Sequence, residues 1–437
     1  MSPLPAPMTD TLSDQDRAFL DEVFERRRAG KFGKRKRLAM LQALPQGMVL
    51  EADERHRFER TGALPARLTS GAETLPPAPP SAYSVIDRVS TDFAIRLTPP
   101  VHHSDGPMPT EKFGRTVVRG YPDIFALEAR DVLGNIKNHQ ALFRLDAGYI
   151  REITDDQALP FADTIGWDEA VELSGKTANM SATGSGMFSH WTFDVLPRFK
   201  VLAERGHPVE SFDHVVISTR NAAFGFHDQG LMRVGVDLDK VRVANQDGPV
   251  FRFAHLVEPS KVRDSYFGEP WVYEEVRRIF AGGKPEGGSP GKRLYIGRKN
   301  TNKRTVLNMA EIQPVLDAFG FVTVYAEDWS IPEFARIMNQ ARVIVGPHGA
   351  GFSNIAFCEP GTRVMELYGP HITVEFWGIS NTLGLQHHIL AGYDEAHRYP
   401  WDDGAFPVAS QKERNAAGFK IDPAHLRRAL AAVCEGA

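Results

Sequence analysis

The part of the chain after residue 291 constrains the fold most, because short apolar segments alternate there with segments that have helical periodicity. Strands are predicted at residues 293–298, 321–326, 343–346 and 363–367. The segment 343–346 is continuously apolar, which is typical of a strand buried on both faces. Strand and helix alternating at this spacing predict a parallel, doubly wound α/β sheet.

Helix boundary signals fall between these strands. Asn308 is placed to cap a helix that runs to residue 319, where Gly320 would end it. Ser330 and Glu333 have the spacing of a capping box before a helix that ends near residue 340. A further helix is expected from about Phe352.

Two segments rich in proline and glycine divide the chain. Residues 281–291 (AGGKPEGGSPG) cannot form the interior of an element, and residues 74–80 (TLPPAPP) suit an extended linker. We therefore expect an appendage and linker at 1–80, an α/β domain at 81–280, a linker at 281–291 and a second α/β domain at 292–437. Within 81–280, strands are predicted at 116–118, 142–145, 214–218 and 251–256.

A basic run, residues 26–37 (RRRAGKFGKRKR), stands out in the appendage. It is a solvated tail, a segment that contacts an anionic membrane surface, each basic residue there contributing about 1 kcal/mol, or, as the least favoured alternative, a nucleic-acid contact. The chain as a whole carries 51 Lys and Arg against 55 Asp and Glu, a net charge of −4. Because this balance is nearly neutral, we expect no nucleic-acid partner.

The two cysteines, Cys358 and Cys434, exclude a disulfide scaffold and fit a reducing compartment. The first residues lack the basic and apolar regions of a secretory signal, and no apolar run reaches the ~20 residues of a membrane span. We therefore expect a cytoplasmic protein that could dock on the inner membrane face through residues 26–37.

Residues 346–354 (GPHGAGFSN) follow a predicted buried strand and begin a helix. Gly349 and Gly351 would allow close approach of the backbone to a ligand, and a helix start presents N–H groups to an anion. The pattern matches neither a dinucleotide fingerprint nor a Walker loop. The alternative is a tight turn around a buried, hydrogen-bonded His348.

Residues 298–304 (RKNTNKR) place Arg298 and Arg304 in a loop at the same predicted sheet edge. Arginine forks match phosphate oxygens, so with the glycine turn this loop predicts a diphosphate clamp. Alone, it could be an ordinary solvated loop. Glu366 ends a strand at the same edge and could accept a hydrogen bond from a ribose or sugar hydroxyl.

Residues 184–199 (GSGMFSHWTFDVLPRF) combine an apolar stripe with a polar line of His190, Asp194 and Arg198, four residues apart. A carboxylate one turn from a histidine can fix its tautomer and make it more basic, which suits a general base for a hydroxyl proton. Pro197 should kink the helix or begin a new one. The alternative is an ion pair on a helix face beside the core.

Weaker signals are a possible metal pair, Asp237 and Asp239, and two histidines, His387 and His388, within a predicted strand. Short acidic pairs are common in turns, so a metal role for the aspartates is the less favoured interpretation. The two histidines are expected to be structural.

Three segments resemble the family 61 glycosyltransferases, once described as capsular polysaccharide biosynthesis proteins: SHWTFDVLPRF (189–199), YIGRKNTNKRTVLN (295–308) and VIVGPHGAGFSNIAFCEPGTRVMEL (343–367). The resemblance implies a GT-B architecture, in which two Rossmann-like domains face a cleft. It also implies an inverting transfer from a nucleotide-sugar, often UDP-linked, to a glycan acceptor, with no cofactor and no obligatory metal.

On the family pattern, each candidate site residue has an expected place. Arg298 and Arg304 would hold the diphosphate, and His190 with Asp194 would face the acceptor, His190 being the preferred base. The donor site would further include His348, Gly349, Ala350, Gly351, Asn354 and Glu366. Two positions depart from the pattern: Gly297 stands where many members have serine, and Met309 where an acidic residue is common. The resemblance also suggests a bacterial-type enzyme of the cell envelope.

Two other functions are compatible with the sequence. A nucleotide-sugar or glycan binding protein without catalysis would keep the donor site but lack a working base. A metal-dependent hydrolase would use the histidines, although HExxH is absent. The presence of both His190 and Asp194 favours the glycosyltransferase.

Overall fold

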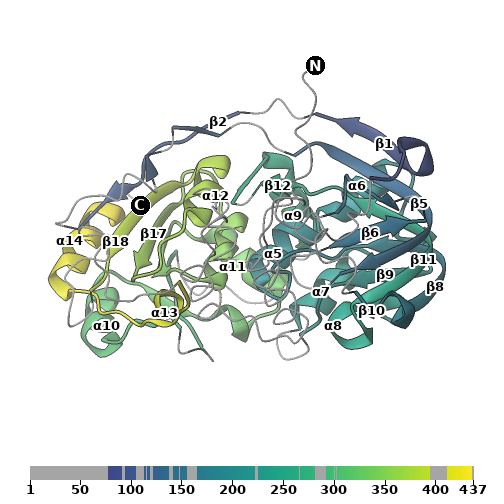
Figure 1. Cartoon of the computed structure of the whole chain (residues 1–437). Helices are drawn as coiled ribbons and strands as arrows, with labels where there is room; N and C mark the ends of the chain where they lie inside the picture. The colour runs from purple at the N-terminus through teal and green to yellow at the C-terminus, as the bar shows by residue number, and fades with distance from the viewer. Residues whose placement is uncertain are drawn as a thin grey trace, which may run out of the picture. The chain divides into compact units, whose positions relative to one another are not determined.

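A computed structural model gives the fold in Figure 1. The described residues are 77–90, 94–104, 113–114, 116–118, 122–136, 141–146, 148–154, 165–221, 225–264, 266–280, 292–299, 301, 303–393 and 411–435. The basic run at 26–37, nearly all of the expected appendage at 1–80, and the expected linker at 281–291 lie outside them. Among the described residues, no helix has the length and apolar character needed to cross a membrane.

The chain forms two compact units, each built from separate stretches of sequence. Of the described residues, the first unit takes those within Met1–Ser84, Glu128–Thr177 and Val243–Leu256, and the second takes those within Val85–Leu127, Ala178–Arg242 and Val257–Ala437. The expected domain boundaries stay predictions. Every candidate site residue belongs to the second unit.

The second unit contains a six-stranded sheet in which every neighbouring pair is parallel (Figure 1). Its strands, in spatial order, are β15 (Val322–Val324), β14 (Arg293–Ile296), β16 (Val343–Pro347), β17 (Arg363–Tyr368), β18 (Gln386–Ala391) and β3 (Val101–His102). This confirms the predicted parallel α/β sheet. The chain order reverses at β14, so β14 and β16 flank a topological switch point.

The helices of this sheet are α10 (Met309–Ala318), α11 (Ile331–Gln340), α12 (Glu375–Leu383), α13 (Gln411–Ala416) and α14 (Pro423–Cys434). Apolar residues of the sheet pack with α10 and α14 in one core, which includes Val345, Leu316 and Leu430. The strand β16 is buried along its whole length, as its sequence predicted.

Two cap predictions had different outcomes. The capping box is present, since the Glu333 carboxylate accepts the N–H of Ser330 at 2.9 Å. The Asn308 prediction was wrong: its side chain does not cap α10 but exchanges hydrogen bonds of 2.9 and 2.8 Å with the N–H and C=O of Ile421. The Asn308 amide nitrogen also donates to the Glu311 carboxylate, in the first turn of α10, at 3.1 Å, so this side chain links the helix start to Ile421 without capping a backbone N–H.

The other large sheet has eight strands in the order β10-β9-β8-β11-β5-β6-β7, with β1 beside β5. These strands are β1 (Ser84–Val89), β5 (Ile124–Asn135), β6 (Leu142–Leu145), β7 (Gly148–Tyr149), β8 (Val171–Asn179), β9 (His214–Ile217), β10 (Val241–Val243) and β11 (Val250–Pro259). The predicted strands at 142–145, 214–218 and 251–256 are thus confirmed, with shifted ends for the last two.

Short elements complete the second unit. The strands β2 (Ile95–Arg96) and β4 (Val117–Val118) pair antiparallel, as do β12 (Arg263–Asp264) and β13 (Phe267–Gly268). The helices α7 (Phe226–Arg233) and α9 (Pro270–Phe280) pack on each other, and α9 also packs against α11.

Candidate functional site

The switch point between β14 and β16 brings the two predicted phosphate-binding segments together. Arg298 follows the carboxyl end of β14, and His348 and Gly349 follow the carboxyl end of β16. The Nη1 atom of Arg298 donates to the carbonyl of His348 at 2.8 Å. In open α/β sheets a ligand binds outside the carboxyl ends of the strands at this point, so the topology and the side chains indicate the same place.

Gly349 is required here for space rather than for conformation. A Cβ atom on residue 349 would collide with the guanidinium of Arg298, whereas the φ of 161° is ordinary extended backbone. Gly297 has a comparable explanation, because the ring of Tyr325 occupies the place of a Cβ at that position. Tyr325 therefore accounts for glycine where many family members have serine.

Arg298 and Arg304 are half-buried cations without a carboxylate partner among the described residues. Arg298 bonds a carbonyl, and Nη1 of Arg304 donates to the side-chain oxygen of Asn415 at 3.0 Å. The Nε atoms of both are buried and lack a hydrogen-bond partner. Burial, and next the charge of Arg304, lowers the pKa of Arg298 to about 10. Withdrawing a cation from water without a carboxylate partner has a cost, which makes this pair a candidate anion site.

His371, which the sequence analysis did not single out, lies beside this pair. Its ring centroid is 5.2 Å from that of His348. Burial, followed by the positive charges of His348, Arg304 and Arg414, lowers the pKa of His371 to about 3. The surroundings of His371 are therefore strongly electropositive. Its position directly after β17, at the carboxyl edge of the sheet, was the available sequence signal.

His348 and Glu366 form a buried pair beneath the turn. The Nδ1 atom of His348 bonds one carboxylate oxygen of Glu366, and the other oxygen accepts the Tyr368 hydroxyl at 2.7 Å. Burial opposes ionisation of Glu366, but the charge and hydrogen bond of His348 outweigh it and lower its pKa to about 2. Thr373 Oγ1 lies 3.3 Å from Nε2 of His348. This agrees with the buried, hydrogen-bonded His348 of the alternative interpretation, and Glu366 holds that histidine in place.

The helix after the turn differs in type from the prediction. It is η10 (Ala350–Phe357), a 3₁₀ helix that begins two residues earlier than expected. The side chain of Asn354 is buried and donates to the carbonyl of Gly351 at 2.7 Å, inside the helix. The N–H groups at the start of such a helix have no partner within it, so Ala350 and Gly351 still present backbone donors near Arg298.

The predicted base lies in a widened helix. The chain runs from α5 (Phe188–His190) through a π-helical turn, η6 (Trp191–Val195), to α6 (Arg198–Glu204). Pro197 offers no N–H, and the N–H of Leu196 reaches back five residues to Trp191 at 3.2 Å. The predicted break at Pro197 is thus present as a π turn. Such single turns occur frequently at functional sites.

His190 and Asp194 are paired as the spacing predicted. Nδ1 of His190 lies 2.6 Å from Oδ2 of Asp194, and the two side chains are 21% and 22% exposed. Since Nδ1 is engaged, Nε2 is the nitrogen that can take a proton. Gly184, at φ 74°, lies against the imidazole, because a Cβ there would be 2.9 Å from Cδ2 of His190. This left-handed glycine leaves room for the ring.

Arg263 is the second partner of Asp194 and was missed by the sequence analysis, where nothing marked it. Its Nε donates to Oδ1 of Asp194 at 2.5 Å. Burial disfavours the charged form of Asp194, but the positive charge of Arg263 and the hydrogen bond from His190 outweigh it, so the pKa of Asp194 lies below its usual value. Asp194 is therefore ionised beside His190.

The His190–Asp194 pair and the glycine turn after β16 are connected within the second unit. The helix α5, which ends at His190, packs against η10, and η10 packs against α12. At the start of α12, Phe376 lies 5.0 Å from the ring of His348, and the preceding residue, Glu375, pairs with Arg263 at 3.2 Å. The start of α12 thus contacts His348 directly and reaches the His190–Asp194 pair through Arg263.

Other sequence candidates have structural explanations. Arg198 leaves the polar line and forms a buried ion pair with Glu258 at 2.7 Å. Asp237 accepts the N–H of Asp239 at 3.0 Å, as in an ordinary turn. His387 and His388 are buried in β18, as expected for structural residues. Within the described ranges no group of three or more His, Cys, Asp or Glu could hold a metal ion.

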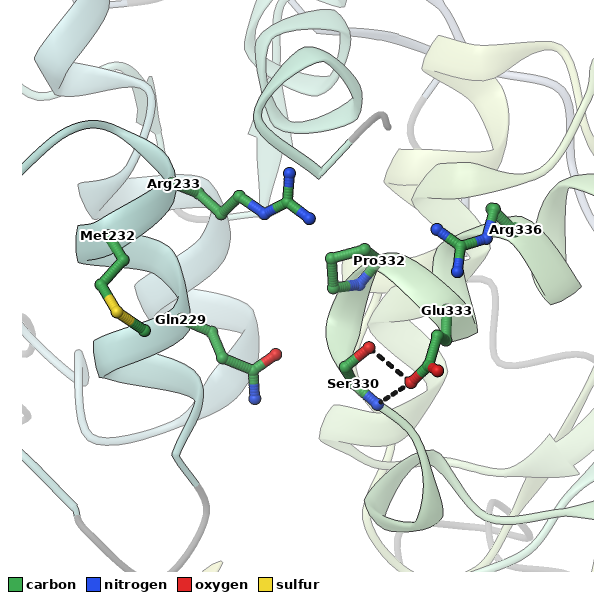
Figure 2. Close-up of a pocket in the computed structure, with 7 residues that line it drawn as sticks. All are labelled: Gln229, Met232, Arg233, Ser330, Pro332, Glu333 and Arg336. Carbon is green, nitrogen blue, oxygen red and sulfur yellow. Dashed lines mark hydrogen bonds between the residues drawn. The ribbon is translucent and has the colours of Figure 1, made fainter. Parts of the chain in front are cut away.

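A surface pocket separate from these residues lies between α7 and α11 (Figure 2). Gln229 and Ser330 face each other across it, and the guanidinium groups of Arg233 and Arg336 lie above them in the view. The Gln229 side chain accepts the N–H of Ile331 at 3.0 Å and so links the two helices. None of the predicted site residues lines this pocket.

Comparison with known proteins confirms the resemblance. Residues 188–365 match the family model described as Glycosyltransferase 61, so this part of the chain is a domain of that glycosyltransferase family. A protein of rice (Oryza sativa subsp. japonica) named beta-1,2-xylosyltransferase XAX1 is 35% identical over 85 residues, which is 18% of this chain and 15% of the rice protein. The region matched by the family model, 188–365, contains every candidate residue of the site except Glu366, which directly follows it.

Proposed function

We propose that the protein is an inverting glycosyltransferase that moves a sugar from a nucleotide-sugar, UDP-linked by preference, to a glycan acceptor. The observation that carries the proposal is the pair of half-buried guanidiniums without a carboxylate partner among the described residues, Arg298 and Arg304, at the switch point of a glycosyltransferase 61 domain. A diphosphate would supply the negative charge that this pair lacks. We further propose that the chain has a GT-B architecture, with the predicted domains at 81–280 and 292–437 as its two parts.

In the proposed reaction, the acceptor hydroxyl oxygen forms a bond to the anomeric carbon from the face opposite the nucleotide. The bond between that carbon and the phosphate oxygen breaks, and the diphosphate leaves with the electron pair. The hydroxyl proton moves to Nε2 of His190, whose Nδ1 is oriented by Asp194. Inversion at the carbon follows from this single displacement.

The donor site would stabilise the leaving group electrostatically. Arg298, Arg304 and the backbone donors of Gly349, Ala350 and Gly351 would contact the diphosphate, whose charge grows as the bond breaks. His348 and Asn354 would shape the turn, with Glu366 holding His348. In this mechanism the fixed cations take the place of an obligatory metal, and activity in excess chelator would test that assignment.

Thermal-shift measurements with UDP-, GDP-, CMP- and dTDP-sugars test the donor class, because specific binding to the native state raises the melting temperature. We expect one nucleotide to stabilise the protein and the others to have much smaller effects. No shift with any of them would contradict the proposal. Once the preferred nucleotide is known, donors that carry different hexoses and pentoses on that nucleotide would identify the sugar.

A non-catalytic nucleotide-sugar or glycan binding protein is the second candidate. Slow hydrolysis of the donor without acceptor distinguishes the two, since a pure binder should release no sugar. The His190–Asp194 pair favours the enzyme, because a binding module has no use for an oriented base. A cytoplasmic location, docking of residues 26–37 on an anionic membrane, and a bacterial cell-envelope role are further proposals, which fractionation of the native cells would test.

A further inference from the structure

Arg263 is the most deeply buried charge near the proposed base. It lies in β12, and its side chain is 0% exposed. Its guanidinium carbon lies 5.1 Å from the centre of the Phe193 ring, which covers one side of the group. Because a buried guanidinium cannot lose its proton at ordinary pH, its charge must be balanced by neighbouring groups.

Two carboxylates balance that charge, and they come from different elements. Asp194 belongs to the π-helical turn η6 and accepts from Nε of Arg263. Glu375 is the first residue of α12 and accepts from Nη2 at 3.2 Å. The guanidinium therefore joins η6, which carries Asp194, to the start of α12. The residue after Glu375 in α12, Phe376, packs on the ring of His348.

We propose that Arg263 is a positioning residue for the base: its fork holds the Asp194 carboxylate against Nδ1 of His190 and ties that pair to the start of α12. This inference rests on the proposed function for the role of His190. The planar fork matters because it engages both carboxylates at once, which a single ammonium at the end of a flexible chain does less well.

The charges around the pair predict the effect of removing Arg263. The ionisable groups that face it are Asp194, Glu375, Tyr266 and Tyr273, with His190 beyond Asp194. Burial raises the pKa of Tyr273 to about 12, so that hydroxyl stays neutral. Loss of the Arg263 charge would make Asp194 easier to protonate, since a neighbouring positive charge disfavours protonation of a carboxylate.

The test compares Arg263→Gln and Arg263→Lys with a matched control, Arg198→Lys. Arg198 is also a buried arginine with a carboxylate partner, Glu258, but within the described part of the chain its hydrogen bonds go to Glu258 and to backbone carbonyls, not to His190 or Asp194. Three quantities are measured for each variant: the titration of the His190 ring by NMR, the acidic limb of kcat/KM against pH, and the dissociation constant of the nucleotide-sugar.

For Arg263→Gln we expect the acidic limb to move to higher pH, and the His190 titration to differ from that of Arg198→Lys. We expect kcat to fall by about 10-fold or more, while donor affinity changes by less than about 3-fold. Arg263→Lys should keep the titration near that of the wild type, because the charge is retained, but should still lose turnover because the fork is lost. Arg198→Lys should move neither the titration nor the limb.

The inference is overturned if Arg263→Gln leaves the His190 titration where Arg198→Lys leaves it. If Arg263→Gln does not fold, Arg263→Lys decides the matter, and wild-type turnover in that variant overturns the inference. Failure of the proposed function appears differently. If the wild type neither binds nor hydrolyses any nucleotide-sugar, the reaction is wrong, yet the NMR titration still reports whether Arg263 positions His190.

Discussion

The guanidinium of Arg298 occupies the space that a side chain on residue 349 would need, and its Nη1 donates to the carbonyl of His348 at 2.8 Å. The cationic group and the glycine turn are therefore one piece of structure, built from the loops after β14 and β16. Neither segment could bind an anion in the proposed way without the other.

Gly349→Ala should weaken donor binding while leaving the protein folded. The added Cβ would displace the guanidinium of Arg298, and a loss of its charged hydrogen bonds costs about 1.5–3 kcal/mol, or about 10- to 100-fold in affinity. Calorimetric titration with the nucleotide-sugar measures this loss. Gly166→Ala is a suitable control, because a Cβ there meets only ordinary contacts, the nearest being Glu169 Oε2 at 3.4 Å. Equal affinity in both variants would argue against the clamp.

Arg304→Gln should weaken donor binding but not destabilise the empty protein. In the unliganded state Arg304 adds a second positive charge beside Arg298, which, after burial, is the next cause of the lowered pKa of Arg298. Removing it relieves this repulsion, so the free energy of unfolding without ligand should stay equal or rise. Urea denaturation with and without the nucleotide-sugar separates the two effects. A large loss of stability in the empty protein would indicate a structural role instead.

His190→Asn and Asp194→Asn should differ in stability although both reduce turnover. Loss of a general base costs at least about 100-fold in kcat. His190→Asn leaves the Asp194–Arg263 pair intact and should unfold at nearly the wild-type temperature. Asp194→Asn removes one of the two carboxylates that balance the buried Arg263, at a cost on the order of 3 kcal/mol. Differential scanning calorimetry beside steady-state kinetics checks both. Wild-type turnover in either variant would exclude the pair as the base.

His388 should make the protein less stable as the pH falls. Burial, and then the charge of His103, whose Nε2 lies 3.0 Å from Nδ1 of His388, lowers the pKa of His388 to about 4, from a model-peptide value of 6.5. Because the folded pKa is below the unfolded one, the unfolded chain binds more protons between these values, and stability is lost as the pH falls through that window.

The measurement is the urea midpoint at about pH 7.5 and about pH 5 for the wild type and His388→Asn. The wild type should lose on the order of 1 kcal/mol more than the variant over this range. The quantity compared is the change in stability between the two pH values, not the absolute stability of the variant. An equal loss in both proteins would show that His388 does not titrate differently on folding.

Local sequence was sufficient wherever the deciding interaction is local. The strands of the parallel sheet follow from apolar runs, and the start of α11 follows from Ser330 and Glu333, which bond each other. The His190–Asp194 pair follows from a four-residue spacing that survives the start of the π turn. Asn308 shows the limit of this reasoning, because its side chain is taken by Ile421, a residue more than a hundred positions away.

The tertiary structure decided which charged side chains pair with each other. Arg263 carries no recognisable motif, yet it lies under Asp194 because β12 and α12 bring it there. Conversely, Arg298 and Arg304 look like one basic loop among many until folding half-buries them with no carboxylate partner among the described residues. The sequence alone determined the sheet, the glycine turn and the candidate base. Only folding decided which of these charges are paired and which lack a partner among the described residues. The reason is that folding sets the distances between residues far apart in the chain and reduces their contact with water.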